Sequence, residues 1–286
     1  MAFFHMHVQI IGRSAGRYAV AAGAYRSGSK LHCQRSGLTF DYRKKQDVIR
    51  SGLLAPMILA PPGAPAWVND RELLYNKIED GEKRRDAQLL REFDIAIPNE
   101  LDDESAKMLV LKWNRECFLV HHLVSDVAFH SGFQGKNRHV HVLVTLRRIE
   151  AGGFSAKKAV ELHHPRMCDC WRQAWERLCN ESLASVGAVE TITRLSLAAQ
   201  GIARSPQRHM GQVLTAMHRR GAISDEEWNR SLHKSEVSNA EQQRRPRINI
   251  NDLNTWWADF KHRLVPKVGT GIQRLDSRPN TNRGPG

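Results

Sequence analysis

Three histidines lie close together in the segment HSGFQGKNRHVHVLVTLR, residues 130–147. From His139 onward polar and apolar residues alternate, so His139 and His141 share one face of a predicted strand and a row of apolar residues forms the other. His130 ends the preceding apolar run, VSDVAFH, and the connection contains Gly and Asn, which predicts an antiparallel hairpin. In such a hairpin three imidazoles can converge on one divalent metal ion.

Two other interpretations of these histidines stay open from the sequence. The chain has 14 histidines, and an HxH pair alone is a weak signal because hydrogen-bonded or surface histidines are common. His5 and His7 form a second HxH, on the polar face of a strand predicted over residues 4–11. That pair competes for a metal ion, or forms an edge that faces DNA.

The charge of the chain indicates a polyanionic partner. The chain has 43 Lys and Arg against 30 Asp and Glu, a formal net charge of +13. The partner of such a protein is usually nucleic acid and less often a membrane surface. No stretch is long and apolar enough to span a bilayer, and the start MAFFHMHVQIIGR lacks the features of a signal peptide, so we expect no membrane insertion. Five cysteines without a CxxC pair predict a protein of the reducing cytoplasm.

A metal site on a basic protein is suited to phosphoryl transfer, and Tyr25 is the candidate nucleophile. A tyrosine forms a covalent phosphotyrosine that conserves the bond energy for rejoining, but its phenol needs a nearby base or cation. Arg26 and Lys30, in the segment that follows, can contact a phosphate and are candidate DNA-binding residues. Tyr25 also shares a helical stripe with Tyr18, so an aromatic contact in the core is the alternative.

The elements that position these residues predict an α+β fold. Glu92 is central in an otherwise apolar strand over 89–98, where it serves as a base, fixes a metal-binding histidine or faces solvent. With the hairpin and the strand over 4–11, this gives a mainly antiparallel sheet with helices packed on one face. We expect helices over 69–85, 102–120 and 168–186, a helix that Ser14 caps, and an extended Pro-rich passage over 53–67.

The C-terminal part of the chain has a different composition. Beyond about residue 235 it is polar, basic and poor in core-forming residues, which predicts disorder. The stretch WWADFKHRL within it is expected to form a short docking helix. We therefore predict two parts: residues 1–212 as the folded domain, and residues 213–286 as a helical segment followed by a disordered basic tail.

Four ordered blocks, spread over roughly residues 3–212, resemble the MobA/MobL (MobQ-type) plasmid mobilisation relaxases. The resemblance implies the HUH-endonuclease fold, with a central antiparallel sheet and helices packed on one side. It also implies the roles of Tyr25 as nucleophile, of the carboxylate Glu92, and of His130, His139 and His141 as metal ligands. The four blocks are HMHVQIIGRSAGRYAVAAGAYRSG, NKIEDGEKRRDAQLLREFDIAIPNE, DVAFHSGFQGKNRHVHVLVTLR and QGIARSPQRHMG.

The resemblance further implies an activity and its partners. Such an enzyme nicks one strand at a plasmid origin of transfer, stays linked to the 5′ end through its tyrosine, leaves a free 3′-OH and later rejoins the strand. We expect Mg²⁺ or Mn²⁺ as the cofactor and single-stranded origin DNA as the substrate. Relaxosome accessory proteins and a type IV coupling protein are the expected partners, with export of the enzyme on the transferred strand.

Two positions depart from the family pattern. Relatives usually have Asn-Pro-His before the second metal ligand, where this chain has Asn137-Arg138-His139, and the substitution predicts a looser turn with Arg138 available for DNA. Relatives often carry Asp-x-Arg-Ser before QGI, and Thr193 stands here in place of the Asp. The second departure affects a contact outside the chemical centre.

Two alternative functions are compatible with parts of this pattern. A DNA-binding mobilisation or replication-control protein keeps the fold without the chemistry, but the intact Tyr25 and the three histidines disfavour it. A three-histidine hydrolase acting on a small molecule is disfavoured by the positive charge. Covalent trapping of a 5′-labelled product separates all three functions.

Overall fold

The computed structural model describes residues 2–44, 49–131, 137–203, 211–233 and 255 of the chain. The chain divides into two units, Met1–Ile248 and Asn249–Gly286, and residue 255 is the described part of the second. The predicted basic tail, apart from residue 255, and the WWADFKHRL helix therefore lie outside the described residues. The boundary after residue 212 stays a prediction.

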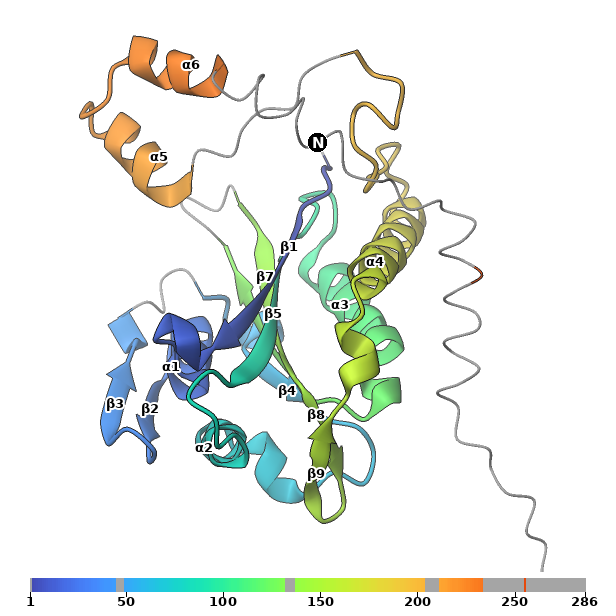
Figure 1. The fold of residues 1–286 in the computed structure, drawn as a ribbon. Helices are drawn as coiled ribbons and strands as arrows, with labels where there is room; N and C mark the ends of the chain where they lie inside the picture. The colour runs from blue at the N-terminus through green and yellow to red at the C-terminus, as the bar shows by residue number, and fades with distance from the viewer. Residues whose placement is uncertain (1, 45–48, 132–136, 204–210, 234–254, 256–286) are drawn as a thin grey trace, which may run out of the picture. The chain divides into compact units, whose positions relative to one another are not determined.

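A five-stranded antiparallel sheet forms the centre of the first unit (Figure 1). The four strands predicted from the sequence form this sheet together with β4, and the strand predicted over residues 4–11 is its edge strand β1, so the predicted α+β class and central antiparallel sheet are confirmed. In spatial order the strands are β1 (Met6–Gly12), β5 (Gln88–Ala96), β7 (His139–Thr145), β6 (Ser125–His130) and β4 (Met57–Leu59).

Two long helices cover the apolar face of this sheet: α3 (Asp103–Cys117) and α4 (Arg166–Ser185). Phe93 of β5 lies at the centre of the contact, with its ring centroid 5.2 Å from that of Trp113 in α3 and 5.2 Å from that of Trp171 in α4. Asp102 caps α3 by accepting a hydrogen bond from the Ser105 N–H. These are the helices that amphipathic spacing predicted over 102–120 and 168–186.

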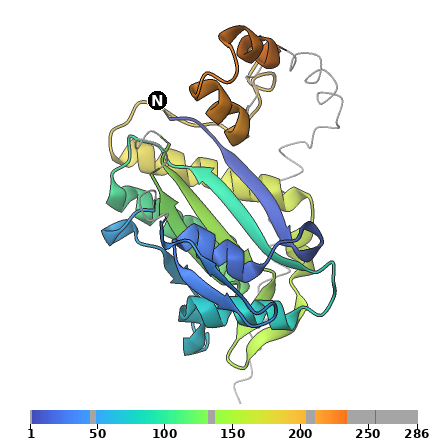
Figure 2. The same ribbon diagram turned by 90° about the vertical axis from the view of Figure 1, so that its left-hand side faces the viewer.

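The opposite face of the sheet carries α1 (Ala19–Ser27), α2 (Arg71–Gly81) and the hairpin of β2 (Lys30–Cys33) and β3 (Leu38–Asp41). In Figure 2, α1 and the hairpin of β2 and β3, drawn in blue, lie in front of the sheet. Its buried residues, such as Val20 of α1 and Leu74 of α2, belong to one apolar cluster with Leu143 of β7. The face that bears the histidines is therefore partly packed by helices as well.

A buried carboxylate fixes α2 to the sheet. Asp126 of β6 accepts two hydrogen bonds from the Arg71 guanidinium, at 2.7 and 2.8 Å, and one from the Tyr75 hydroxyl, at 2.7 Å. A buried charge is tolerated only when it is paired and hydrogen-bonded. Asp126 therefore fixes the position of α2 on the sheet, and with it the position of the elements that pack on α2.

Two sequence expectations were wrong about local structure. The first helix does not begin after Ser14, because Arg13–Ala15 form a 3₁₀ turn (η1) that ends at Gly16 with φ of 67°, and α1 begins only at Ala19. Such a φ suits glycine and breaks a right-handed helix. The Pro-rich passage is extended at β4, as expected, but it is not extended throughout, because Ala66–Asn69 form a 3₁₀ turn. The three residues of β4 are too few to show a period in the sequence, so its place in the sheet was not predicted.

The remaining elements are short and were not expected individually. They are η3 (Gly52–Leu54), η4 (Ala66–Asn69), η5 (Leu119–His121), β8 (Arg147–Glu150), β9 (Gly153–Lys158), η7 (Val160–His163), α5 (Gly211–Arg219) and α6 (Asp225–His233).

None of the helices among the described residues is both long and apolar enough to cross a membrane. The five cysteines, all within the described residues, form no disulfide with one another.

The contact between α1 and α2 predicts a strong effect at Gly23. A Cβ at this position would lie 1.9 Å from a carbon of the Tyr75 ring, which is buried and held by Asp126. Gly23→Ala should therefore lower the free energy of unfolding by about 1–3 kcal/mol, measured by urea denaturation. Gly81→Ala is the matched control, because the nearest atom to its added Cβ lies at 3.9 Å. Equal stabilities of the two variants would contradict this packing.

Candidate active site

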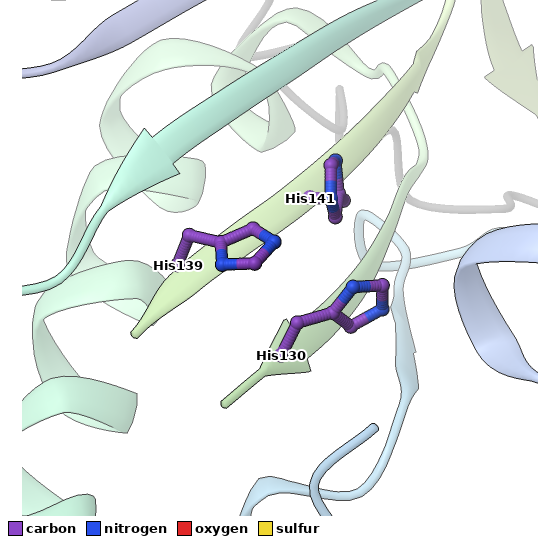
Figure 3. Close-up of side chains that lie close together, drawn as sticks. All are labelled: His130, His139 and His141. Carbon is purple, nitrogen blue, oxygen red and sulfur yellow. The ribbon is translucent and has the colours of Figure 1, made fainter. Parts of the chain in front are cut away.

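The predicted hairpin brings the three histidines together. His130 is the last residue of β6 and pairs directly with His139, the first residue of β7, while His141 lies two residues further on the same face. Figure 3 shows the three rings turned toward one another from two adjacent strands. One ring nitrogen from each histidine lies within 4.8 Å of the others, which is a spacing that one metal ion can bridge.

Each of these rings is oriented by a hydrogen bond to an oxygen. Because a carbonyl or carboxylate oxygen only accepts, the bonded nitrogen carries the hydrogen and the other nitrogen of a neutral ring keeps its lone pair. This is the usual arrangement of histidines that hold a metal, so the donor set fits a divalent ion. The bonds are His130 Nε2 to the Arg26 carbonyl at 2.8 Å, His139 Nδ1 to the Asn137 carbonyl at 2.7 Å, and His141 Nδ1 to Glu92 Oε1 at 3.1 Å.

Burial keeps two of the rings neutral. Desolvation lowers the pKa of His130 to about 4, against a weaker opposing effect of its bond to the Arg26 carbonyl. Burial likewise lowers the pKa of His141, although the hydrogen bond with Glu92 opposes the shift. Neutral imidazole is the form that binds metal ions, so the site is ready to accept one at neutral pH.

Glu92 is the centre of a hydrogen-bond network under the histidines. Its side chain is 2 % exposed and accepts bonds from Gln9 Nε2 at 2.8 Å, from Arg26 Nε and from His141. Burial alone would raise the pKa of Glu92, but the bonds from His141 and Arg26 outweigh it and hold the pKa at about 2. Such a carboxylate accepts a proton poorly near neutral pH. Between the two roles considered from the sequence, the geometry favours orienting His141 over acting as a base.

Tyr25 lies next to the two contacts that tie α1 to this network. Arg26 follows it and contacts His130 through its carbonyl and Glu92 through its guanidinium. The half-buried Tyr25 ring makes an edge contact with Tyr42, with centroids 5.1 Å apart. Tyr18, the other tyrosine of the predicted helical stripe, precedes α1 at its opposite end, about 10 Å along the helix, and packs on Phe40. The structure thus brings Tyr25, and not Tyr18, to the end of α1 that contacts the histidines.

The three predicted DNA-binding residues have different surroundings. Lys30 is exposed at the start of β2. The Arg26 guanidinium pairs with Glu92 and lies 4.8 Å from the centroid of the Tyr25 ring. Arg138 donates to the Leu101 carbonyl at 2.5 Å and to Asp103 at 3.1 Å. Arg138 therefore stabilises the segment that leads into β7. From the sequence we expected a looser turn here, because Arg replaces the Pro of relatives.

His5 and His7 lie outside the cluster. Both residues are exposed. His7 lies in β1 and pairs with Asp94 of β5, so β5 separates this segment from β7. Gln9, on the same face, was missed by the sequence reasoning although it bonds Glu92 directly. Gln9 shares the polar face of its strand with His5 and His7, which could have indicated a role in the site. Its bond to Glu92 could not be predicted, because it depends on the register of β1 against β5.

Comparison with known proteins places the site in a family. The model of the MobA/MobL family matches residues 17–220. The chain belongs to the MobA/MobL family. Tyr25, Glu92 and the three histidines of this MobA/MobL chain all lie within the matched span. The fold and the family that the sequence blocks predicted are therefore confirmed.

Three relatives show how far the similarity extends. The probable conjugal transfer protein TraA of Sinorhizobium fredii is 32% identical over 94% of this chain and 27% of its own length. The mobilization protein MobL of Acidithiobacillus ferridurans is 32% identical over 77% of this chain and 65% of its own length. A structure solved for the molecular basis of vancomycin resistance transfer in Staphylococcus aureus is 26% identical, with a TM-score of 0.62, over 68% of this chain and 100% of that chain.

The depressed pKa of His130 predicts how stability depends on pH. Because its pKa falls from 6.5 when unfolded to about 4 when folded, the unfolded chain binds more protons between these values. In EDTA, the free energy of unfolding should therefore fall as the pH drops from 6.5 to 4, by on the order of 3 kcal/mol.

Urea denaturation at several pH values measures this dependence. His130→Gln should flatten the pH profile, because glutamine does not titrate and can still donate to the Arg26 carbonyl. The same change at the exposed His7 is the control and should leave the profile unchanged. Parallel profiles for wild type and His130→Gln would contradict the assignment.

Proposed function

We propose that this MobA/MobL chain is a DNA relaxase that nicks and rejoins one strand at a plasmid origin of transfer. The observation that carries the proposal is the double contact of α1 with the histidine network. Arg26 bonds His130 through its carbonyl and Glu92 through its side chain, so Tyr25, the preceding residue of α1, is the neighbour in the chain of both contacts. A nucleophile, a metal site and a basic surface are the parts that phosphoryl transfer needs.

The proposed reaction is a transesterification. The Tyr25 oxygen forms a bond to the scissile phosphorus, and the bond between phosphorus and the 3′ oxygen breaks. The tyrosine loses its phenolic proton and the leaving 3′ oxygen gains one, so protons balance. One phosphodiester is exchanged for another, which keeps the energy for rejoining by the reverse step.

The residues of the candidate site have different roles in this reaction. His130, His139 and His141 would hold the ion through the nitrogens that lack a hydrogen, and Glu92 keeps the His141 ring in the required orientation. When bound, the ion neutralises charge that develops on the phosphate oxygens. Mg²⁺ prefers oxygen ligands, so of the two ions expected, Mn²⁺ suits this nitrogen donor set better.

The substrate and partners follow from the charge and from the family. A net charge of +13 favours binding to DNA phosphates, with an affinity that falls steeply as salt rises. Origin specificity then requires a smaller set of contacts to bases or to a hairpin. We propose single-stranded origin DNA as the substrate, with relaxosome proteins and a type IV coupling protein as partners. The enzyme would act in the cytoplasm and leave with the transferred strand.

Replacing the proposed nucleophile tests the function directly. Tyr25→Phe keeps the edge contact with Tyr42 but removes the attacking oxygen, so single-stranded DNA binding should persist and nicking should disappear. A candidate origin strand labelled on the 3′ side of the nick makes the covalent adduct visible on a denaturing gel.

Tyr18→Phe is the matched control, because it removes the other hydroxyl associated with α1. An adduct that persists in Tyr25→Phe and vanishes in Tyr18→Phe would move the nucleophile to Tyr18. Binding without any adduct in the wild type, over a set of origin strands, would favour the inactive DNA-binding protein.

Removing one metal ligand should have an equally specific effect. His139→Ala and His141→Ala should abolish nicking in Mg²⁺ or Mn²⁺, because two imidazoles cannot hold the ion in the same geometry. Isothermal calorimetry with Mn²⁺ alone measures the lost binding without any DNA. His7→Ala is the control, since this exposed histidine lies outside the cluster. Loss of Mn²⁺ binding in His7→Ala would overturn the assignment of ligands.

A further inference from the structure

The helix that carries Tyr25 has no cap of its own. The residue at its N-cap, Tyr18, makes no side-chain hydrogen bond to the helix, although the first N–H groups of any helix lack partners within it. The Ala19 N–H instead donates to Glu79 Oε1 of α2, at 2.6 Å. A negative charge at this end of a helix also interacts favourably with the helix dipole.

Glu79 is held in place by an arginine from outside both helices. Its side chain is fully buried, and its second oxygen, Oε2, accepts bonds from Arg13 Nε at 3.1 Å and Nη2 at 2.6 Å. Arg13 also donates to the main-chain carbonyls of Glu79 and Glu82 at the end of α2. One carboxylate oxygen thus accepts from the Ala19 N–H of α1 and the other from Arg13, so the buried charge of Glu79 is paired and the first N–H group of α1 has a partner.

The support on which α1 lies is itself rigid. Gly23 lets α1 approach the Tyr75 ring of α2 without an intervening side chain. Tyr75 in turn donates to Asp126 of β6, the strand that ends in His130. Contacts at its start, its middle and its end therefore fix α1 relative to the histidine cluster.

We propose that Glu79, paired with Arg13, is a positioning residue for Tyr25. This inference rests on the proposed function, in which Tyr25 is the nucleophile. Tyr25 lies six positions after Ala19 in the helix, about 9 Å along its axis, so a displacement at the capped end moves the phenol. Glu79 is fully buried and cannot contact DNA, so its effect falls on the rate of nicking and not on DNA affinity.

Glu79→Gln is the first test, because it keeps the shape of the side chain and removes the charge that Arg13 and the helix end share. We expect kcat for nicking to fall about 10- to 100-fold while KM and the Kd for single-stranded DNA change less than about twofold. Glu79→Asp keeps the charge on a shorter side chain and should recover part of the lost kcat. If Glu79→Gln does not fold, Glu79→Asp alone must still show a lower kcat at unchanged Kd.

Two controls separate positioning from loss of stability. Asp80→Asn removes the neighbouring carboxylate, which is exposed on the same helix, and should leave kcat unchanged. Leu109→Ala destabilises the core on the other face of the sheet and should leave kcat per folded molecule unchanged. A fall in kcat for Glu79→Gln no greater than for Leu109→Ala, or an equal loss of DNA affinity, would overturn the positioning role.

The outcomes also distinguish this inference from the proposed function. An adduct that persists in Tyr25→Phe moves the nucleophile to another residue, and the absence of an adduct in the wild type removes the proposed function; in both cases the premise of this inference fails. If the wild type nicks through Tyr25 and Glu79→Gln matches its kcat, the relaxase function stands and only the role of Glu79 fails.

Discussion

Buried carboxylates paired with arginines hold the layer of α1 and α2 against the sheet. Asp126 anchors α2 through Arg71, and Glu92 anchors the end of α1 through Arg26. Removing one partner of such a pair leaves a buried charge without compensation, which costs on the order of 3–5 kcal/mol. These pairs add to the apolar cluster that packs α1 and α2 on the sheet, and they fix the end of α1 that lies next to the histidines. The arrangement of Tyr25 and the histidines therefore depends on them.

Glu92 links the two halves of the candidate site. The same carboxylate orients His141 and binds Arg26 of the helix that carries Tyr25. A change in the position of either element therefore changes the surroundings of the other. This coupling explains why a carboxylate with a pKa of about 2 is central to the site although it accepts protons poorly near neutral pH.

The two faces of the sheet make different contributions to the site. On the apolar face, aromatic rings from α3 and α4 pack edge to face around Phe93 and make the strands rigid. The other face carries the polar network, where each hydrogen bond depends on strand register. A rigid core behind the sheet keeps that register, and so keeps His130, His139 and His141 convergent.

The sequence alone determined the elements with a clear period and the residues that one strand or hairpin brings together. Alternation predicted β1, β5 and β7, and the short connection after the apolar run of β6 predicted that His130 lies close to His139. Contacts distant in sequence were decided only by the tertiary structure, such as Gln9 with Glu92 and Ala19 with Glu79. No local pattern encodes them, because they depend on strand register and on the packing of α1 against α2. The same reason explains why β4 was missed and why Arg138 braces its turn: each is stabilised by a partner that lies elsewhere in the chain.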